Sequence, residues 1–182
     1  MHNLSDITRI TGGNRRTLQF WAEQGVLLST RQHEGSGVPR EFDDHEVIVA
    51  CVVNGFSSQG VPVGKLIGAA DGVRNHLVSP VNRAMFNDAI TGQGINLLLL
   101  ATYSAKSDGG PKETSDVSMF SDTRSDFTLE DWFKFLITSD LLAFTSVNLN
   151  ACLARVQFRL AQSAVVEGLK APAFSTSWPK SG

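Results

Sequence analysis

The sequence predicts an α+β protein in which a helical N-terminal part precedes a small α/β part. Two observations predict this class. Residues 1 to about 75 contain segments with helical apolar spacing, separated by turns that contain glycine. Residues 76–170 alternate between apolar runs typical of strands and segments with helical spacing. Residues 171–182 are rich in proline and serine, and we expect a disordered tail there.

Two short helices joined by a tight turn are expected at the N-terminus. Ile7 and Ile10 lie three residues apart and mark the apolar stripe of a first helix, which Ser5 can cap. Thr11-Gly12-Gly13 ends this helix, since glycine tolerates a left-handed exit. Asn14 is a favourable N-cap for the second helix, which we expect to end near Gln24.

The second helix has a buried face and an exposed face. Leu18, Trp21 and Ala22 have the spacing of residues that point toward a core. Polar side chains near the helix start point the other way, and they are Arg15, Arg16, Thr17 and Gln19.

A two-stranded wing is expected after this helix. Residues 26–28 and 40–42 read as short strands, and the turn-rich residues 32–39 between them suit a hairpin. A third helix follows Asp43 or Asp44, and a fourth begins at Pro62. Two helices, a tight turn and a wing together predict a winged helix-turn-helix in residues 1–75.

The exposed face of the second helix has the chemistry needed to read double-stranded DNA. The base edges of the major groove and the phosphates beside it are largely acceptors, which arginine and glutamine side chains can meet. Arg15, Arg16, Thr17 and Gln19 supply donors, and Arg31 and Arg40 add two cations on the wing. Residues 1–42 contain five arginines and four carboxylates, a net charge of only +1, so long-range attraction is not the main source of affinity.

These residues also carry a family resemblance. Residues 4–12 (LSDITRITG), 16–27 (RTLQFWAEQGVL), 31, 40–42 (REF) and 59–63 (QGVPV) resemble the N-terminal domain of the MerR family. The resemblance spans about residues 3–70. Its most specific element is the run Thr-Leu-x-Phe-Trp followed by Gly-x-Leu.

The resemblance implies a winged domain whose second helix enters the major groove, and a homodimer on a near-palindromic site. Carried over by position, it places Arg31 and Arg40 on phosphates. The same transfer puts four residues on the recognition helix: Arg16, Thr17, Gln19 and Phe20. Gln19 stands where the family usually has arginine, and the long dimerising helix and the metal-binding cysteines of the family are absent from the sequence pattern.

The remaining residues predict a compact α/β unit. We expect a helix from Ser79-Pro80 to Gly92, strands at 95–103 and 141–147, and a long exposed loop at 104–125 with a short strand near 117–120. Thr128 to Asp131 form a capping box that opens a helix. A final helix is expected from residue 149 to about 167, and its apolar stripe either packs on the strands or forms a dimer seam. That stripe is Leu149, Leu153, Val156 and Leu160.

Several classes of function are not expected. Cys51 and Cys152 lie singly among apolar residues, and neither they nor the histidines have the spacing of a metal site. Residues 76–182 show no nucleophile with a base and no phosphate loop, so we expect neither an enzyme nor a cofactor. No signal peptide or membrane span is recognisable, and the expected location is cytoplasmic.

Two functions therefore remain. The first is a sequence-specific transcriptional regulator in which residues 76–170 form a homo-oligomer or sense an effector, either a small molecule or a protein. The second is a DNA-architecture or assembly protein, such as a phage packaging or recombination accessory factor, which would use the same N-terminal domain to reach DNA.

Overall fold

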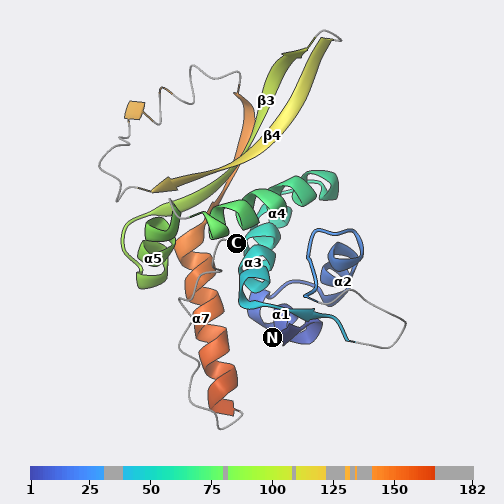
Figure 1. The fold of residues 1–182 in the computed structure, drawn as a ribbon, viewed down its shortest axis with the longest axis vertical. Coiled ribbons are helices and arrows are strands. Elements are labelled where there is room, and N and C mark those ends of the chain that lie inside the picture. Colours follow the sequence, from blue (N-terminus) through green and yellow to red (C-terminus); the bar gives the residue numbers. More distant parts are fainter. Residues whose placement is uncertain are drawn as a thin grey trace.

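The computed structural model describes residues 1–30, 39–79, 82–107, 110–121, 130, 131, 134 and 141–166. This part of the chain mixes helices with two antiparallel sheets, as Figure 1 shows. The helices are α1 (Leu4–Thr11), α2 (Arg15–Glu23), α3 (Asp44–Ser58), α4 (Val63–Val78), α5 (Arg83–Thr91) and α7 (Leu149–Val166). The strands are β1 (His2–Asn3), β2 (Glu41–Phe42), β3 (Asn96–Ser107), β4 (Gly110–Ser121) and β5 (Leu141–Asn148).

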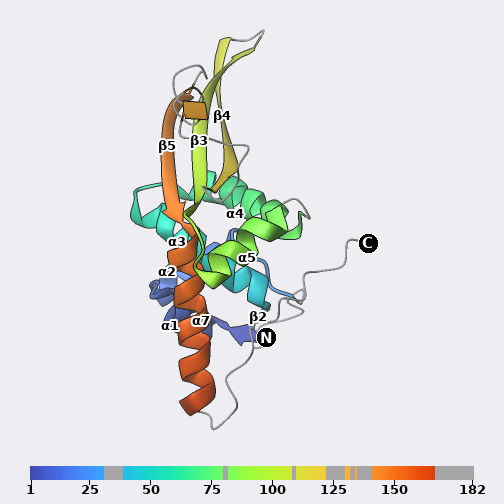
Figure 2. The ribbon, with the colours of Figure 1, turned by 90° about the vertical axis from the view of Figure 1, so that its left-hand side faces the viewer.

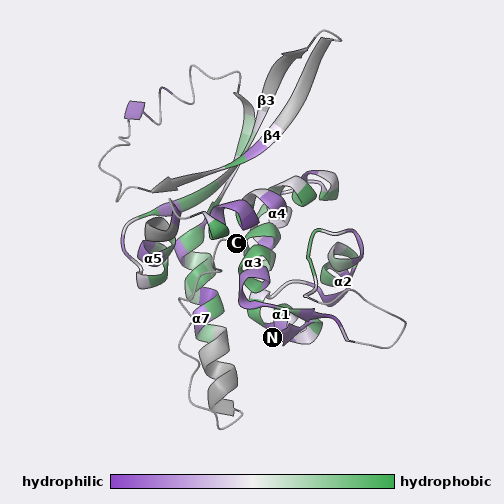
Figure 3. Cartoon of the chain, viewed as in Figure 1, coloured by the Kyte–Doolittle hydropathy of each residue, from purple (hydrophilic) through white to green (hydrophobic). Residues whose placement is uncertain are grey.

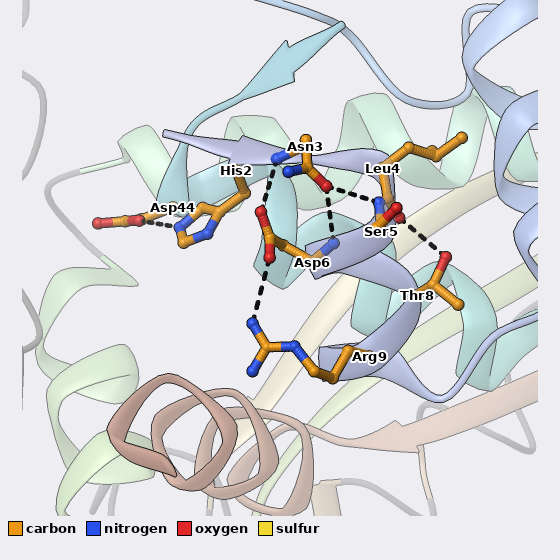
Figure 4. A network of polar contacts seen from close by, with 8 residues as sticks. All are labelled: His2, Asn3, Leu4, Ser5, Asp6, Thr8, Arg9 and Asp44. Carbon is orange, nitrogen blue, oxygen red and sulfur yellow. Dashed lines mark hydrogen bonds and ion pairs between the residues drawn. The ribbon is translucent and has the colours of Figure 1, made fainter. Parts of the chain in front are cut away.

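The helix-turn-helix pair forms as predicted, with one difference at its start. Asn3, not Ser5, caps α1: its side-chain oxygen accepts from the backbone N–H groups of Ser5 (2.8 Å) and Asp6 (3.0 Å). The Asp6 carboxylate accepts from the backbone N–H of Asn3 in return, which completes a capping box (Figure 4). Gly12 ends α1 with a φ of +69°, a left-handed conformation that glycine adopts without strain, and Asn14 caps α2.

The strand predicted at residues 26–28 does not form. Val26 and Leu27 donate their backbone N–H groups to the Trp21 carbonyl at the end of α2, and Leu28 donates to a Glu46 carboxylate oxygen. Their donors are therefore used by a helix end and by a side chain, so none remains for a strand partner.

β2 pairs instead with β1, in the register His2 with Phe42 and Asn3 with Glu41. Thr30 donates its backbone N–H to the Glu41 carbonyl (2.8 Å), which joins the described residues before segment 31–38 to those after it. That segment, which contains Arg31 and most of the predicted wing loop, lies outside the described residues.

Helix α3 is the centre of the molecule. Every side chain from Glu46 to Val53 is buried, because α1, α4, α7 and β5 all pack against this helix. Figure 3 shows the hydrophobic colour along α3, between its neighbours. Helix α4 runs without interruption through residues 75 and 76, and the buried apolar residues on both sides of that point form one core.

The second sheet has the strand order β4-β3-β5. The strands predicted at 95–103 and 141–147 are confirmed, but the loop predicted at 104–125 is wrong over much of its length. β3 and β4 pair without a break from Asn96 with Ser121 to Ser107 with Gly110, and this hairpin extends past the helices (Figure 1). The pairing is made by backbone groups, so polar side chains are compatible with it.

The last helix packs beside the N-terminal helices. Leu149, Leu153 and Val156 of α7 are buried, and α7 contacts α1, α3 and α5 as well as β3 and β5. Figure 2 shows α7 running down beside α1. The predicted helix after Thr128 falls largely outside the described residues, although Lys134 forms an ion pair with Glu130 (2.9 Å). The predicted tail, 171–182, lies outside them entirely.

Candidate nucleic-acid interface

The outer face of α2 is exposed to solvent because two side chains on its opposite face are buried. Leu18 and Trp21 are fully buried in the core, which fixes the rotation of this short helix about its axis. Five predicted site residues consequently lie on the exposed side, namely Arg15, Arg16, Thr17, Gln19 and Phe20. Arg15 and Arg16 have no ion-pair partner among the described residues, so their donors are available to a ligand.

An open hollow of about 540 Å³ lies beside this face of α2. It brings three separate segments together: the start of α1, the outer side of α2 and the residues that lead into β2. Its polar lining includes Asn3, Ser5, Arg15, Gln19, Glu23 and Arg40. The structure thus places Arg40 near α2, and the strand pairing that positions Arg40 differs from the expected hairpin.

Arg40 is half-buried at the rim of this hollow. Its guanidinium Nη1 is shielded from solvent and has no hydrogen-bond partner among the described residues. A buried donor without an acceptor costs on the order of 1–3 kcal/mol. An anionic ligand that reached this nitrogen would therefore be bound more favourably than by an arginine already paired within the protein.

Glu23 adds a negative charge to the outer face of α2, a position that was not predicted from the sequence. The Gln19 side-chain amide donates to its carboxylate over 3.1 Å, one helical turn along α2. This contact orients the Gln19 amide and also makes Glu23 an acceptor on the same face. The i, i+4 spacing of the two residues was the available signal.

A buried ion pair fixes the chain where it leaves α2. Arg74 on α4 donates through Nη2 to Glu46 on α3 (2.6 Å) and to the Val26 carbonyl (2.6 Å). Glu46 accepts from the Leu28 backbone N–H (2.8 Å). Burial alone would lower the pKa of Arg74, but the hydrogen bonds and charges of Glu46 and Asp71 together outweigh burial and raise that pKa. We name these contacts the Arg74–Glu46 clamp.

A second polar contact holds β1 against the start of α3. His2 Nε2 and an Asp44 carboxylate oxygen lie 2.7 Å apart, and Figure 4 shows the two side chains in contact. The hydrogen bond with His2 lowers the pKa of Asp44, against the opposing effect of burial. Since β1 runs directly into α1, this contact also fixes the start of α1 beside the hollow.

Helix α2 therefore begins with two cations, Arg15 and Arg16, that have no ion-pair partner among the described residues, and the hollow beside it is also lined by Arg40. Residues 3–72 match the family model described as "MerR HTH family regulatory protein". The resemblance predicted for about residues 3–70 is confirmed, and we refer to residues 3–72 as the MerR-like segment. It covers less than half of the chain. No curated protein matches the sequence.

The described residues show few other features that could bind a ligand. Within the ranges that the structure describes, no group of three or more His, Cys, Asp and Glu residues could hold a metal ion. Cys51 and Cys152 are buried free thiols, and the hydrogen bond with Cys51 together with burial raises the pKa of Cys152. None of the described helices is long and apolar enough to cross a membrane.

Proposed function

We propose that the protein is a sequence-specific DNA-binding transcriptional regulator. In this proposal α2 enters the major groove and Arg40 contacts the phosphate backbone beside it. The observation that carries the proposal is the MerR-like segment together with the exposed face of α2, where Arg15 and Arg16 are unpaired among the described residues. Arg31 would add a further backbone contact from segment 31–38.

The side chains on α2 differ in the DNA groups that they can bind. Arginine donates two hydrogen bonds to the guanine edge, and glutamine pairs in a similar way with adenine. Glu23 disfavours phosphate nearby but can accept from the amino group of cytosine. Gln19 and Glu23 together are therefore better suited to contact base edges than phosphates, whereas Arg40 is suited to contact the phosphate backbone.

A regulator of this kind is expected to act as a homodimer. A single small module buries too little surface for the affinity of about 10⁻⁸ M or tighter that specific complexes usually reach. Two copies on a near-palindromic site would supply the missing surface, and the part of the chain after the MerR-like segment would hold them together or sense an effector.

The first prediction concerns specificity. The double variant Arg16→Ala with Gln19→Ala should lose much of its preference for the cognate duplex over random DNA, because each base pair read by a bidentate side chain is worth about 1–3 kcal/mol of discrimination. The measurement is the ratio of dissociation constants for the cognate and random duplexes, after sites have been selected from a random library.

A matched control is Lys134→Ala, which also removes a cation but lies outside the MerR-like segment, paired with Glu130. Its specificity ratio should equal that of the parent. If the double variant also keeps the parental ratio, α2 does not read bases and the proposal fails.

The second prediction concerns the backbone contact. Arg40→Ala should weaken binding to cognate and random duplexes by a similar factor, since a phosphate contact carries no sequence information. The slope of log K against log salt should become less steep by about 0.9. Titrations at several salt concentrations measure this, and an unchanged slope would rule out a phosphate contact by Arg40.

A further inference from the structure

Arg155 of α7 lies against the turn of the helix-turn-helix, although it is far outside the MerR-like segment. Gly12, the residue that ends α1, has no side chain, and a Cβ placed there would approach the Arg155 guanidinium Nη2 to 2.6 Å. Cys152 and Val156 are buried on either side of Arg155 along α7, so the backbone that carries this arginine is held in the core. The packing of α7 in the core thus keeps the Arg155 guanidinium next to the turn that follows α1.

Arg155 is an exposed residue, and its charge has no partner among the described residues. It forms no ion pair within the part of the chain that the structure describes, and it donates no hydrogen bond to the carbonyl groups at the end of α1. A role as a helix cap would require such a bond. Its charge acts on the nearby buried thiols of Cys51 and Cys152 and favours a lower pKa for each, whereas burial favours a higher one.

The position of Arg155 suits a duplex that receives α2. Arg15, the first residue of α2, follows Gly12 by three residues, so their Cα atoms are at most about 11 Å apart. The major groove is about 12 Å wide, and a phosphate backbone borders it on each side. A duplex with the start of α2 in its groove therefore has phosphates within reach of the long Arg155 side chain, whose guanidinium lies beside Gly12.

We propose that Arg155 contacts a DNA phosphate beside the helix-turn-helix turn, so that the C-terminal part of the chain belongs to the DNA-binding surface. This inference rests on the proposed function. The contact pairs a cation with a backbone phosphate, and it adds affinity without sequence preference. It also makes DNA affinity sensitive to how α7 sits against α1.

The test compares Arg155→Gln, Arg155→Lys and the control Lys134→Gln, each in the full chain. Arg155→Gln should weaken binding to cognate and random duplexes alike and reduce the salt slope by about 0.9. The ratio of the parent's DNA-binding constant to that of Arg155→Gln should then fall by about threefold between 50 and 200 mM salt. Arg155→Lys should keep the parental slope, and so should Lys134→Gln.

The outcomes separate this inference from the proposed function. If the parent binds DNA and Arg155→Gln keeps the parental salt slope, Arg155 makes no phosphate contact and only the inference fails. A loss of thermal stability with an unchanged slope also overturns the inference, since it indicates a purely structural role. If the parent binds no duplex from a random library, the proposed function fails and the inference fails with it.

Discussion

Arg74→Met is expected to lower the free energy of unfolding by about 3–5 kcal/mol, because it leaves the Glu46 carboxylate buried without its cation. The Glu46 side chain is only 8% exposed, and its two oxygens accept from Arg74 Nη2 (2.6 Å) and Nε (3.1 Å). The variant also leaves the Val26 carbonyl without its donor. Denaturant unfolding followed by circular dichroism measures the change.

Two controls distinguish the buried pair from a general effect of losing charge. Asp71 also pairs with Arg74, but its side chain is 60% exposed, so Asp71→Asn should change stability by no more than about 1 kcal/mol. Adding Glu46→Gln to Arg74→Met should recover part of the loss, because a neutral amide can still accept from Leu28. If Arg74→Met lowers the free energy of unfolding by less than about 1 kcal/mol, the Arg74–Glu46 clamp does not contribute as a buried ion pair.

Gly72→Ala is expected to destabilise the protein by about 1–3 kcal/mol, the usual cost of inserting atoms into a packed core. Gly72 lies where α4 meets β4, and a Cβ there would come within 2.7 Å of the Val117 Cβ and 2.8 Å of its Cγ2. Val117 is itself buried, so it cannot move aside without disturbing its neighbours. The midpoint of thermal unfolding is the readout.

The matched control is Gly68→Ala, one turn earlier on the same helix, where an added Cβ meets nothing within 4 Å. This change should stabilise the protein by up to about 1 kcal/mol, because alanine favours a helix more than glycine does. Combining Gly72→Ala with Val117→Ala should recover part of the loss by making room. Equal effects of the two glycine substitutions would show that α4 and β4 are not closely packed at this point.

Local chemistry explains which parts of the fold the sequence predicted. Asn14 and Gly12 act within a few residues of their own positions, so the turn between α1 and α2 could be read from residue types alone. The periodic burial of Leu18 and Trp21 likewise predicted the exposed face of α2, which carries five of the seven predicted site residues.

Contacts between distant residues explain what the sequence did not reveal. Residues 26–28 have the composition of a strand, but their donors are taken by the end of α2 and by Glu46. The β3–β4 hairpin was hidden by polar composition, although Asp108-Gly109 between the paired residues Ser107 and Gly110 is a known hairpin signal. Arg155 meets Gly12 only through the packing of α7 on α1, which no spacing along the chain encodes.

The strand order β4-β3-β5 leaves one side of β4 at the border of the sheet, with backbone groups that no other described strand satisfies. Such a border can recruit a strand from another molecule, and proline and charged residues commonly prevent this. β4 carries Pro111, Lys112, Glu113 and Asp116. Its sequence therefore opposes aggregation through the projecting hairpin, and copies of this protein that associate should do so through another surface.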